Sequence, residues 1–540
     1  MRFGTCVGLL AFLAMGCGSS AGESSGNPVD PPGVGGSGGD AGKDSGDSGT
    51  PPLPGCDVSK LPSEDPCVVV ESLGVFVSSS SGTANGDGAR GKPYASLTSG
   101  IAAAKASGKR VYACAETYVE TVSFENGVSI FGSFDCANGW IPGTQRATVR
   151  APASPATQAH EITLTTRVES LDLFAPDATA PGGSSIALIA DASPGLRFRH
   201  VGFHAGKGQN GANGANGIQL IDSGSKNGGD GTTAGTCSGL TAQLCHTWHD
   251  AQLGGTNACT GEPGHDPGPG GTGGSGGTFH APQMVFSWTA GTPVASRGLP
   301  VSASIQTEVG GEYGVSPAVS GADGTSGISG KSASAIGALV VIGYVPADGL
   351  AGTAGQPGQG GGGGSGVGLQ QLQAAYSATY APGAPRFTNT GDAWGAPGGG
   401  GGAGGCPGLA GKPGGGGGAS IAIVAIASPF ILDDATMESA TGGAGGAAGT
   451  PSHPTVGGAG GVAYDHAQAG MAGGAGGEAG ISGNGAGGPS FAIASSGAPP
   501  QRLATTAKVG SGGAGVAART IGTTVIPAST DGASAETYVF

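Results

Sequence analysis

The stretch that decides the fold is residues 74–135, which read GVFVSSSSGTANGDGARGKPYASLTSGIAAAKASGKRVYACAETYVETVSFENGVSIFGSFD. A short β-rich run at 75–77 opens it, and the small, polar, glycine-rich residues 78–92 that follow predict a loop. Ser96 can then cap a helix with apolar residues at helical spacing, and Gly108 can end that helix. The beginning of the stretch therefore predicts a strand, a loop and one short helix.

Three further β-rich runs follow the helix at 111–113, 119–124 and 128–131, with a tight-turn signal at Asn126-Gly127. Taken together, VFVSSSSGTANGDGARGKPYASL, the helix and VYACAETYVETVSFENGVSIFGSFD resemble the opening segment of pectin-lyase-like right-handed β-helix proteins. In that family the helix caps the first coil. The resemblance implies a fold but no activity, because this fold carries lyases, hydrolases, adhesins and inert stalks.

An internal repeat appears farther along the chain. The pattern apolar, polar, polar, apolar, polar, apolar occurs at 168–173, 198–203 and 432–437, and similar lead-ins begin at Gly182, Gly417 and Gly487. Two apolar strands joined by a two-residue corner would give this pattern, and a repeat of this size indicates stacked coils with one continuous core. We therefore predict an all-β protein, a right-handed parallel β-helix with an N-terminal capping helix and long glycine-rich insertions. In this core we expect Phe198, Val201 and Leu432 to be buried, and residues 335–345 to form another buried strand pair.

Glycine accounts for 117 of the 540 residues, several times its usual share of about 7%. It gathers in tracts at about 205–282, 309–330, 348–367, 395–418, 441–488 and 510–515. Collagen is excluded because no strict Gly-X-Y register persists and proline is scarce. Two interpretations remain. The tracts are disordered loops, or their extended runs pack side by side as polyglycine-II-like strands with backbone hydrogen bonds between them.

The N-terminus predicts export. Residues 1–17 read MRFGTCVGLLAFLAMGC, in which one Arg precedes an apolar run at 7–15 that is too short to span a bilayer. The run ends in Gly16-Cys17 and resembles a bacterial lipobox, which implies lipidation of Cys17. The alternative is a plain signal peptide cleaved nearby. No Asp follows the Cys, and within this resemblance that favours the outer membrane.

Residues 18–55 consist of Gly, Ser, Pro and Asp with hardly an apolar side chain, the composition of a disordered tether. The predicted organisation is therefore a signal peptide at 1–17, a tether at 18–55 and a β-helix domain with glycine-rich insertions at 56–540. The predicted location is outer membrane-anchored, at the cell surface or periplasmic face.

Cysteine usage fits an exported protein. Without Cys6 and Cys17, eight of the ten cysteines remain, and an even number in an exported chain predicts disulfides. The favoured pairs bracket compact units, Cys56–Cys67 and Cys114–Cys136, and the weaker ones are Cys237–Cys245 and Cys259–Cys406. Since His246, His249 and His265 lie near Cys237, Cys245 and Cys259, a zinc site is a second interpretation of that region, although the spacing matches no common zinc motif.

The charge balance excludes one function class. Lys and Arg number 22 against 36 Asp and Glu, and the net charge of −14 with no basic cluster argues against nucleic-acid binding. Asp433 and Asp434 are adjacent and could act as acid and base on a glycan. They occupy a predicted corner, however, where Asp is also favoured for its turn conformation. Glu169, Arg199 and His200 occupy equivalent corners, and no catalytic residue, metal or cofactor is assigned.

Nearly the whole chain resembles PGRS-like glycine-rich surface lipoproteins of Gram-negative bacteria. The resemblance rests on the lipobox, the acidic Gly/Ser linker, the capping segment and the coils between glycine tracts, and it implies no particular activity. We expect a non-enzymatic cell-surface lipoprotein that acts as a structural spacer or an adhesion protein. Its partners would be the membrane, through the lipid, and a surface polysaccharide or protein. The alternative is a polysaccharide lyase or glycoside hydrolase on the same β-helix. A solvent-facing groove that holds at least two carboxylates, or a carboxylate–Arg pair, from successive coils would favour the enzyme. A featureless Gly/Ala/Ser surface would favour the structural role, and the most informative observation is which face Asp172, Arg199, Asp433 and Asp434 share.

Overall fold

Residues 74–107 contain strand β1, Gly74–Val77, and helix α1, Leu97–Ser107. The computed structural model describes residues 56–232, 252–273, 318–364, 397–464 and 467–540, together with the backbone of six short strands between 278 and 394. As predicted, Ser96 caps α1 by accepting from the Ser99 N–H, and Gly108 ends it in the left-handed conformation. The Glu120 carboxylate also accepts from the N–H groups of Leu97 (2.7 Å) and Thr98 (3.0 Å), which places a negative charge at the helix N-terminus.

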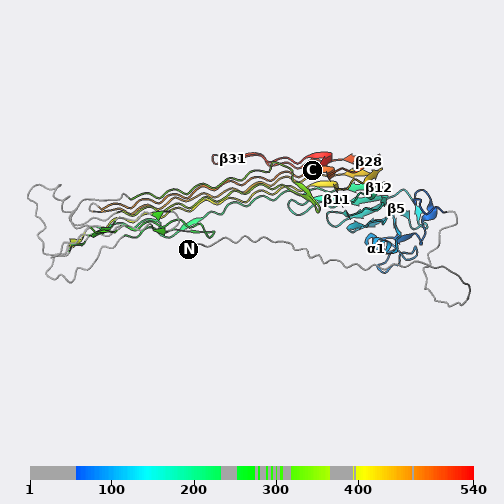
Figure 1. Ribbon diagram of the computed structural model, residues 1–540, viewed down its shortest axis with the longest axis horizontal. Coiled ribbons are helices and arrows are strands. Elements are labelled where there is room, and N and C mark those ends of the chain that lie inside the picture. The colour runs from blue at the N-terminus through cyan, green and yellow to red at the C-terminus, as the bar shows by residue number, and fades with distance from the viewer. Residues whose placement is uncertain are drawn as a thin grey trace, which may run out of the picture. The chain divides into compact units, whose positions relative to one another are not determined.

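Nineteen of the described strands belong to three mainly parallel sheets, together with β1 (Figure 1). Sheet 1 contains β1, β2 (Arg110–Cys114), β5 (Ile130–Asp135), β9 (Thr166–Glu169), β12 (Leu196–Arg199), β25 (Ile431–Asp433) and β28 (Gln501–Leu503), with β6 (Ile141–Pro142) antiparallel to β5. Sheet 2 contains β3 (Thr117–Tyr118), β7 (Ala147–Arg150), β10 (Leu171–Phe174), β13 (Gly202–His204), β26 (Thr436–Glu438) and β29 (Thr506–Lys508). Sheet 3 contains β4 (Val122–Phe124), β8 (Thr157–His160), β11 (Ser185–Asp191), β24 (Ser420–Ile426), β27 (Ser490–Ser496) and β32 (Ser534–Val539).

Six two-stranded antiparallel sheets and a 3-10 turn, Pro66–Val68, complete the described elements. The pairs are β14 (Ile221–Ser223) with β15 (Ala258–Thr260), β16 (Thr278–Phe279) with β23 (Ala393–Trp394), β17 (Ser287–Thr289) with β20 (Ile305–Thr307), β18 (Val294–Ala295) with β19 (Leu299–Pro300), β21 (Ala338–Val340) with β22 (Gly343–Val345), and β30 (Arg519–Ile521) with β31 (Thr524–Ile526).

From β2 onward the chain visits sheets 1, 2 and 3 in that order and then repeats the cycle. In sheet 1 this stacks Val168, Phe198 and Leu432 in register, and all three side chains belong to one buried apolar core. The prediction that Phe198, Val201 and Leu432 are buried is confirmed, since each is at most 1% exposed. The sequence repeat therefore marks successive coils that share one core.

Single residues in the left-handed conformation turn the chain between sheets. Ser170, His200, Asp434 and Ala504 do so between sheets 1 and 2, with φ of 56°, 53°, 47° and 47°. These residues occupy equivalent places in successive coils, because each follows a strand of sheet 1. The predicted two-residue corner is therefore turned by one residue of the pair, and Asp is favoured there because it tolerates this conformation.

Two strand predictions were wrong. Residues 119–124 do not form one strand, because the chain passes there from β3 in sheet 2 to β4 in sheet 3 and leaves Val119 75% exposed. Residues 335–345 are not a buried strand pair of the core. They form the β21–β22 hairpin, in which Ile336 and Tyr344 are buried while Val341 and Ile342 are 62% and 81% exposed.

The glycine-rich insertions leave the sheets at one kind of corner. All of them lie between a strand of sheet 2 and the next strand of sheet 3, at 175–184, 205–419, 439–489 and 509–533. After each insertion the chain enters a strand of sheet 3 that begins with a serine. The hydroxyl of this serine donates at 2.7 Å to a backbone carbonyl near the start of the insertion and so joins the two ends of the insertion. The pairs are Ser185 to Pro176, Ser420 to Gly206, Ser490 to Ala440 and Ser534 to Gly510.

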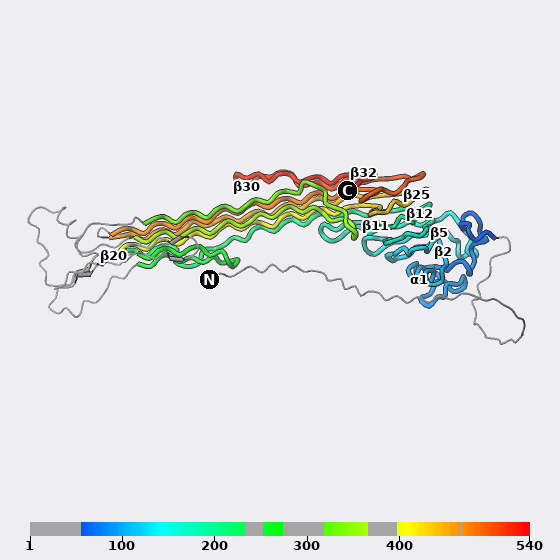
Figure 2. Tube along the Cα trace, viewed as in Figure 1, coloured from blue at the N-terminus to red at the C-terminus, as the bar shows by residue number. Residues whose placement is uncertain are grey.

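Within the insertions, extended tracts run side by side (Figure 2). They are numbered here as tract 1 (205–232), tract 2 (252–273), tract 3 (318–335), tract 4 (346–364), tract 5 (397–419), tract 6 (439–464), tract 7 (467–489), tract 8 (509–518) and tract 9 (527–533). The described tracts adopt the second of the two predicted arrangements. Gly208, Gly211, Gly214 and Gly217 in tract 1 donate their N–H groups to the carbonyls of residues 441, 444, 447 and 450 in tract 6.

This three-residue period is that of the polyproline-II conformation, which has three residues per turn and no internal hydrogen bonds. Three backbone donors per turn can thus reach three different neighbours. In tract 5, Gly418 donates to tract 1, Gly404 to tract 2 and Gly402 to tract 7. Contrary to the prediction from the whole sequence, a register of three does persist within these tracts. The register is local to each tract and invisible in the chain as a whole.

Glycine is required in the tracts because of close packing. A Cβ added to Gly402, Gly446 or Gly477 would strike the backbone carbonyl of a neighbouring tract, that of Gly458, Ala212 or Thr325 respectively. Tract 5 is buried at every position from 397 to 409 and has a run of glycines at 398–402, whereas the peripheral tract 1 has glycine at every third residue from 208 to 217. Glycine spacing therefore reports how many sides of a tract are covered.

Two prolines of tract 6 continue a series of donor positions beyond the end of a neighbouring tract. In tract 6, Gly442 and Gly445 donate to tract 8, and Pro451 and Pro454 continue that series. Since proline has no N–H, it leaves no donor unsatisfied where a neighbouring tract ends.

Candidate functional site

The predicted corner residues do not meet in one site. Glu169, Arg199 and Asp433 are the last residues of the neighbouring strands β9, β12 and β25 and are partners in register. Arg199 Nε lies 3.8 Å from Asp433 Oδ2. Asp434 lies at the following corner, with its Oδ2 3.5 Å from His200 Nδ1. Asp172 lies beyond the corner, on β10 of sheet 2. Each acid of the adjacent pair Asp433-Asp434 therefore contacts a different basic residue of the preceding coil.

Glu169 is the most buried of these acids, with only 6% of its surface exposed. Burial raises the pKa of its carboxyl, and the nearby charges of Arg199 and Arg167 oppose that rise only partly. Its register partner on the preceding strand is Phe131, which belongs to an apolar cluster packed around Tyr112 and Trp140. Glu169 thus borders an apolar cluster, where its charge is poorly solvated.

The outward face of sheet 2 carries a charged cluster that the sequence analysis missed, except for Asp172. Arg146 Nη1 donates to Asp172 Oδ1 at 2.9 Å, and His204 Nε2 lies 3.7 Å from the same oxygen. His204 Nδ1 lies 3.2 Å from Glu438 Oε2. Burial pushes the pKa of Asp172 upward, but His204 and Arg146 outweigh it and hold that pKa below its usual range. Two carboxylates and an imidazole from three successive coils thus lie on one face.

The neighbouring aromatic ring is covered on both sides. The imidazole of His204 stacks on Phe174 with ring centroids 4.2 Å apart and planes 8° from parallel, and the Arg150 guanidinium carbon lies 4.4 Å from the same ring centroid. A sugar ring would need a free aromatic face for stacking, and Phe174 offers none in this arrangement. The row Arg150, Phe174, His204, Glu438 and Lys508 is in register across five strands. Within this row His204 pairs with Glu438, and Arg150 and His204 cover the two faces of Phe174.

Three of the four predicted disulfides are present, Cys56–Cys67, Cys114–Cys136 and Cys259–Cys406. Cys237, Cys245, His246 and His249 lie outside the described residues, as does the lipidation candidate Cys17. Within the described residues, Cys56, Asp65 and Cys67 are close enough to hold a metal ion, but both sulfurs are used in a disulfide. Cys259 is likewise oxidised, which removes it from the zinc interpretation.

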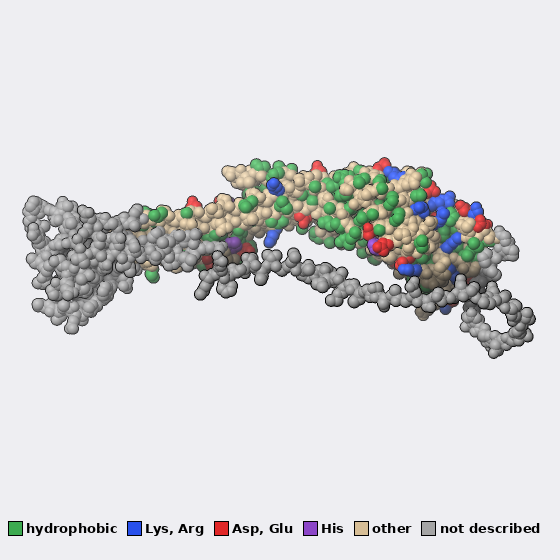
Figure 3. Space-filling view, in the orientation of Figure 1, with side chains coloured by type: hydrophobic (Ala, Val, Ile, Leu, Met, Phe, Trp, Pro, Cys, Tyr) green, Lys and Arg blue, Asp and Glu red, His purple; other side chains and the backbone are tan. Residues whose placement is uncertain are grey.

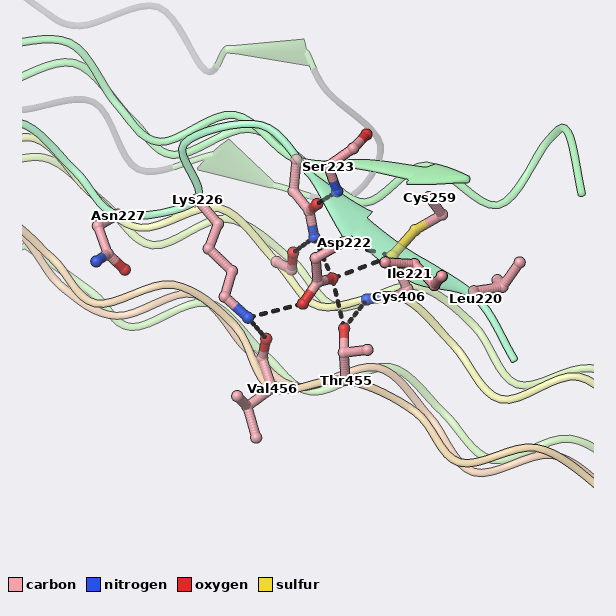
Figure 4. A network of polar contacts seen from close by, with 12 residues as sticks. Leu220, Ile221, Asp222, Ser223, Lys226, Asn227, Cys259, Cys406, Thr455 and Val456 are labelled. Carbon is pink, nitrogen blue, oxygen red and sulfur yellow. Dashed lines mark hydrogen bonds and ion pairs between the residues drawn. A yellow bond between two sulfur atoms is a disulfide. The ribbon is translucent and has the colours of Figure 1, made fainter. Parts of the chain in front are cut away.

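A second polar cluster lies within the glycine tracts (Figure 4). Asp222 Oδ2 accepts from Lys226 Nζ at 2.7 Å, and its Oδ1 accepts from Asn257 Nδ2 at 2.8 Å and Thr455 Oγ1 at 2.7 Å. Burial pushes the pKa of Asp222 upward, but these hydrogen bonds, that of Lys226 first, hold it below its usual range. Cys406, bonded to Cys259, lies against the carboxylate with its Sγ 3.2 Å from Oδ1.

This cluster joins four tracts. Asp222 and Lys226 come from tract 1, Asn257 from tract 2, and Thr455 from tract 6, while the disulfide links tract 2 to tract 5. Asn257 also donates to the Gly404 carbonyl at 3.0 Å, and Thr455 Oγ1 accepts from the Cys406 N–H at 2.7 Å. The polar atoms of Asp222 and Asn257 are used within the protein, so the arrangement acts as a clamp rather than a binding site.

Side chains that cap backbone donors reinforce the outer tracts. Asn210, Asn213 and Asn216 in tract 1 each accept, through Oδ1, the N–H of a residue in tract 6 at 2.8–2.9 Å. Figure 3 shows charged side chains gathered over the sheets and only scattered along the tracts. The tract surface therefore offers mainly small side chains and already-paired backbone groups.

No known protein family, curated protein or solved structure matches this chain. Among the described residues, no helix has the length and apolar character needed to cross a bilayer.

Proposed function

We propose that the protein is a non-enzymatic, membrane-anchored surface protein that acts as a structural spacer or adhesion module. In this proposal the three sheets form a right-handed parallel β-helix capped at its start by α1, and the glycine tracts form a polyglycine-II-type arm that grows out of it. The cyclic order of the sheets and the shared core support the β-helix. The N-terminal lipobox resemblance supports the anchor.

The observation that carries the proposal is the backbone pairing of the tracts. An arm whose strands are joined by hydrogen bonds at every third residue, and fastened by a disulfide and the Asp222 clamp, is far stiffer than a Gly-rich linker. Such an arm positions whatever it carries at a fixed place on the protein. The carboxylates of Asp172, Asp222 and Asp433 each lie within 4 Å of a basic side chain, which also favours a structural role over catalysis.

The anchor and the spacer can be tested separately on the full chain. Cys17→Ser should release the protein from membranes in detergent-free fractionation, and retention of the unprocessed variant to the wild-type extent would overturn the anchor. Replacing Gly399, Gly402 and Gly405 by Ala should loosen the arm, seen as faster protease cleavage within 205–489. Adhesion of cells displaying that variant should fall, and unchanged adhesion with a loosened arm would overturn the spacer role.

The enzymatic alternative is supported by one observation, the Asp172–His204–Glu438 cluster on the outward face of sheet 2. A histidine between two carboxylates can move a proton in glycan cleavage. If the purified chain releases reducing ends or unsaturated products from acidic or neutral polysaccharides, and Asp172→Asn abolishes this, the non-enzymatic proposal is wrong. Asp191→Asn, which alters another carboxylate paired with a histidine, His160, is the matched control.

A further inference from the structure

The β21–β22 hairpin presents an exposed aliphatic turn on a fixed base. Val340, Val341 and Ile342 are 36%, 62% and 81% exposed, and Val345 beside them is 47% exposed. The chain from 332 to 347 contains no charged residue. Single exposed aliphatic residues are ordinary, but three in succession at the tip of an uncharged hairpin are not.

The base of the hairpin is firmly packed. Ile336 and Tyr344 are buried against the outer side of sheet 3, in a cluster that includes Ile186, Ile421 and Phe491. The Tyr344 hydroxyl donates to the Ile336 carbonyl at 2.8 Å and so joins the two arms of the hairpin. Gly337 and Gly343 have φ of 89° and 125°, conformations that side chains rarely allow, so the backbone is shaped to hold this turn outward.

We propose that this turn, residues 340–342, inserts into the surface of a lipid bilayer and gives the protein a second membrane contact. The proposal rests on the membrane anchoring proposed above. A stable protein interface needs roughly 20–30 residues on each side, with aromatic or Arg anchors and a polar rim. The turn offers a few aliphatic side chains and no polar group for specificity, whereas insertion into lipid needs no complementary surface.

The predicted N-terminal anchor also favours the lipid bilayer as the partner of this turn. If residues 18–55 form the Gly/Ser-rich tether that their composition predicts, its root-mean-square span would be about 35 Å. A lipid on Cys17 would then keep the domain close to the bilayer. A few aliphatic side chains bind lipid weakly when free in solution. Held near the membrane by the anchor, they act at a high effective concentration. The contact would therefore orient the protein and contribute little to anchoring it.

The test uses the full lipidated chain in phosphatidylcholine vesicles that contain a lipid with a photoreactive acyl chain. After illumination, mass spectrometry should recover label on the peptide that contains 340–342, and Ile342→Asp should reduce that label at least tenfold. The matched control is Leu253→Asp, which replaces a 74% exposed aliphatic residue on tract 2 and should leave the labelling unchanged.

The outcomes separate the two proposals. A vesicle-bound protein without label at 340–342 overturns the insertion but leaves the anchor intact. A protein that does not stay on vesicles, and carries no lipid on Cys17, overturns the anchor. If crosslinking on intact cells instead joins 340–342 to a protein while the vesicle label is absent, the turn docks a protein partner and the bilayer proposal is wrong.

Discussion

Arg502 and Glu536 form an ion pair, with Nη1 3.1 Å from Oε2, at the open end of the apolar core. Arg502 is the register partner of the fully buried Leu432, and Glu536 lies between the partners of Phe491 and Ile493. Both come from the terminal strands of their sheets, β28 and β32. The last coil thus places charges where earlier coils place core residues, a known way to keep sheet edges from pairing with other chains.

Removing this charged end should promote self-association. Replacing Arg502 by Leu and Glu536 by Ala leaves an apolar end next to unpaired strand edges, and we expect concentration-dependent dimers in sedimentation velocity. Lys508→Leu on the neighbouring terminal strand β29 is the control, because Lys508 lies in the outward ladder of sheet 2. If the double variant sediments as wild type at every concentration, the ion pair does not protect this end.

The close packing of the tracts predicts an unusual sensitivity to a single methyl group. Gly402→Ala should lower the free energy of unfolding by about 1–3 kcal/mol, the usual cost of overpacking, because its Cβ meets the Gly458 carbonyl. Gly91→Ala is the matched control, since an added Cβ there meets no atom within 4 Å. Denaturant melts and hydrogen exchange of tracts 5 and 6 measure the effect. Equal stability of the two variants would contradict the packing described here.

The core prediction compares two neighbouring residues on one strand. Phe198→Ala should cost roughly 3–5 kcal/mol, because the side chain is 1% exposed and contacts Phe124, Phe203 and Phe430. Arg199→Ala should cost within about 0.5 kcal/mol, since its side chain is 49% exposed and its ion pair with Asp433 is long. Denaturant melts of both variants decide between them. A larger loss at Arg199 would assign that side chain a structural network of its own.

Glu169 predicts a pH dependence of stability. Its pKa is raised in the folded protein, so the folded state binds more protons than the unfolded state between the ordinary Glu pKa and the raised one. Stability should therefore fall as the pH rises through that window and then level off. Glu169→Gln should remove this part of the pH dependence and should be relatively more stable above the window.

Thermal melts across the pH range, compared with Glu161→Gln, provide the measurement. Glu161 is a nearby acid that follows strand β8 of sheet 3, but its side chain is 74% exposed. If Glu169→Gln keeps the wild-type slope, the charge of Glu169 is not what opposes folding there.

Local signals in the sequence predicted local structure well. Ser96, Gly108 and the apolar spacing between them placed α1, and the repeated corner pattern placed Phe198 and Leu432 in the core, because these features depend on neighbouring residues only. The split of 119–124 was missed because both parts are β-rich, and only the passage between two sheets separates them. The prediction that 335–345 are buried was wrong because an apolar composition fits both a strand pair in the core and a hairpin on the surface.

The charged clusters depend on partners far apart in the chain. His204 and Glu438 meet on sheet 2 although tracts 1 to 5 lie between them, and Asp222 meets Thr455 in the same way. No spacing in a single sequence reveals such pairs. The one available signal was the placement of Asp222 and Lys226 four residues apart, which in a helix would predict an ion pair and here forms one without a helix.

The prolines at 451 and 454 have a consequence for self-association. A sheet of polyglycine strands can grow sideways without limit, because each added strand presents a fresh row of donors to the next molecule. By placing proline where the last neighbour ends, the chain removes the row that a second molecule would join. We therefore expect that copies of the protein do not join through this row of tract 6 into a fibre. Gly in place of Pro451 and Pro454 should restore the N–H donors and allow tracts of two molecules to pair.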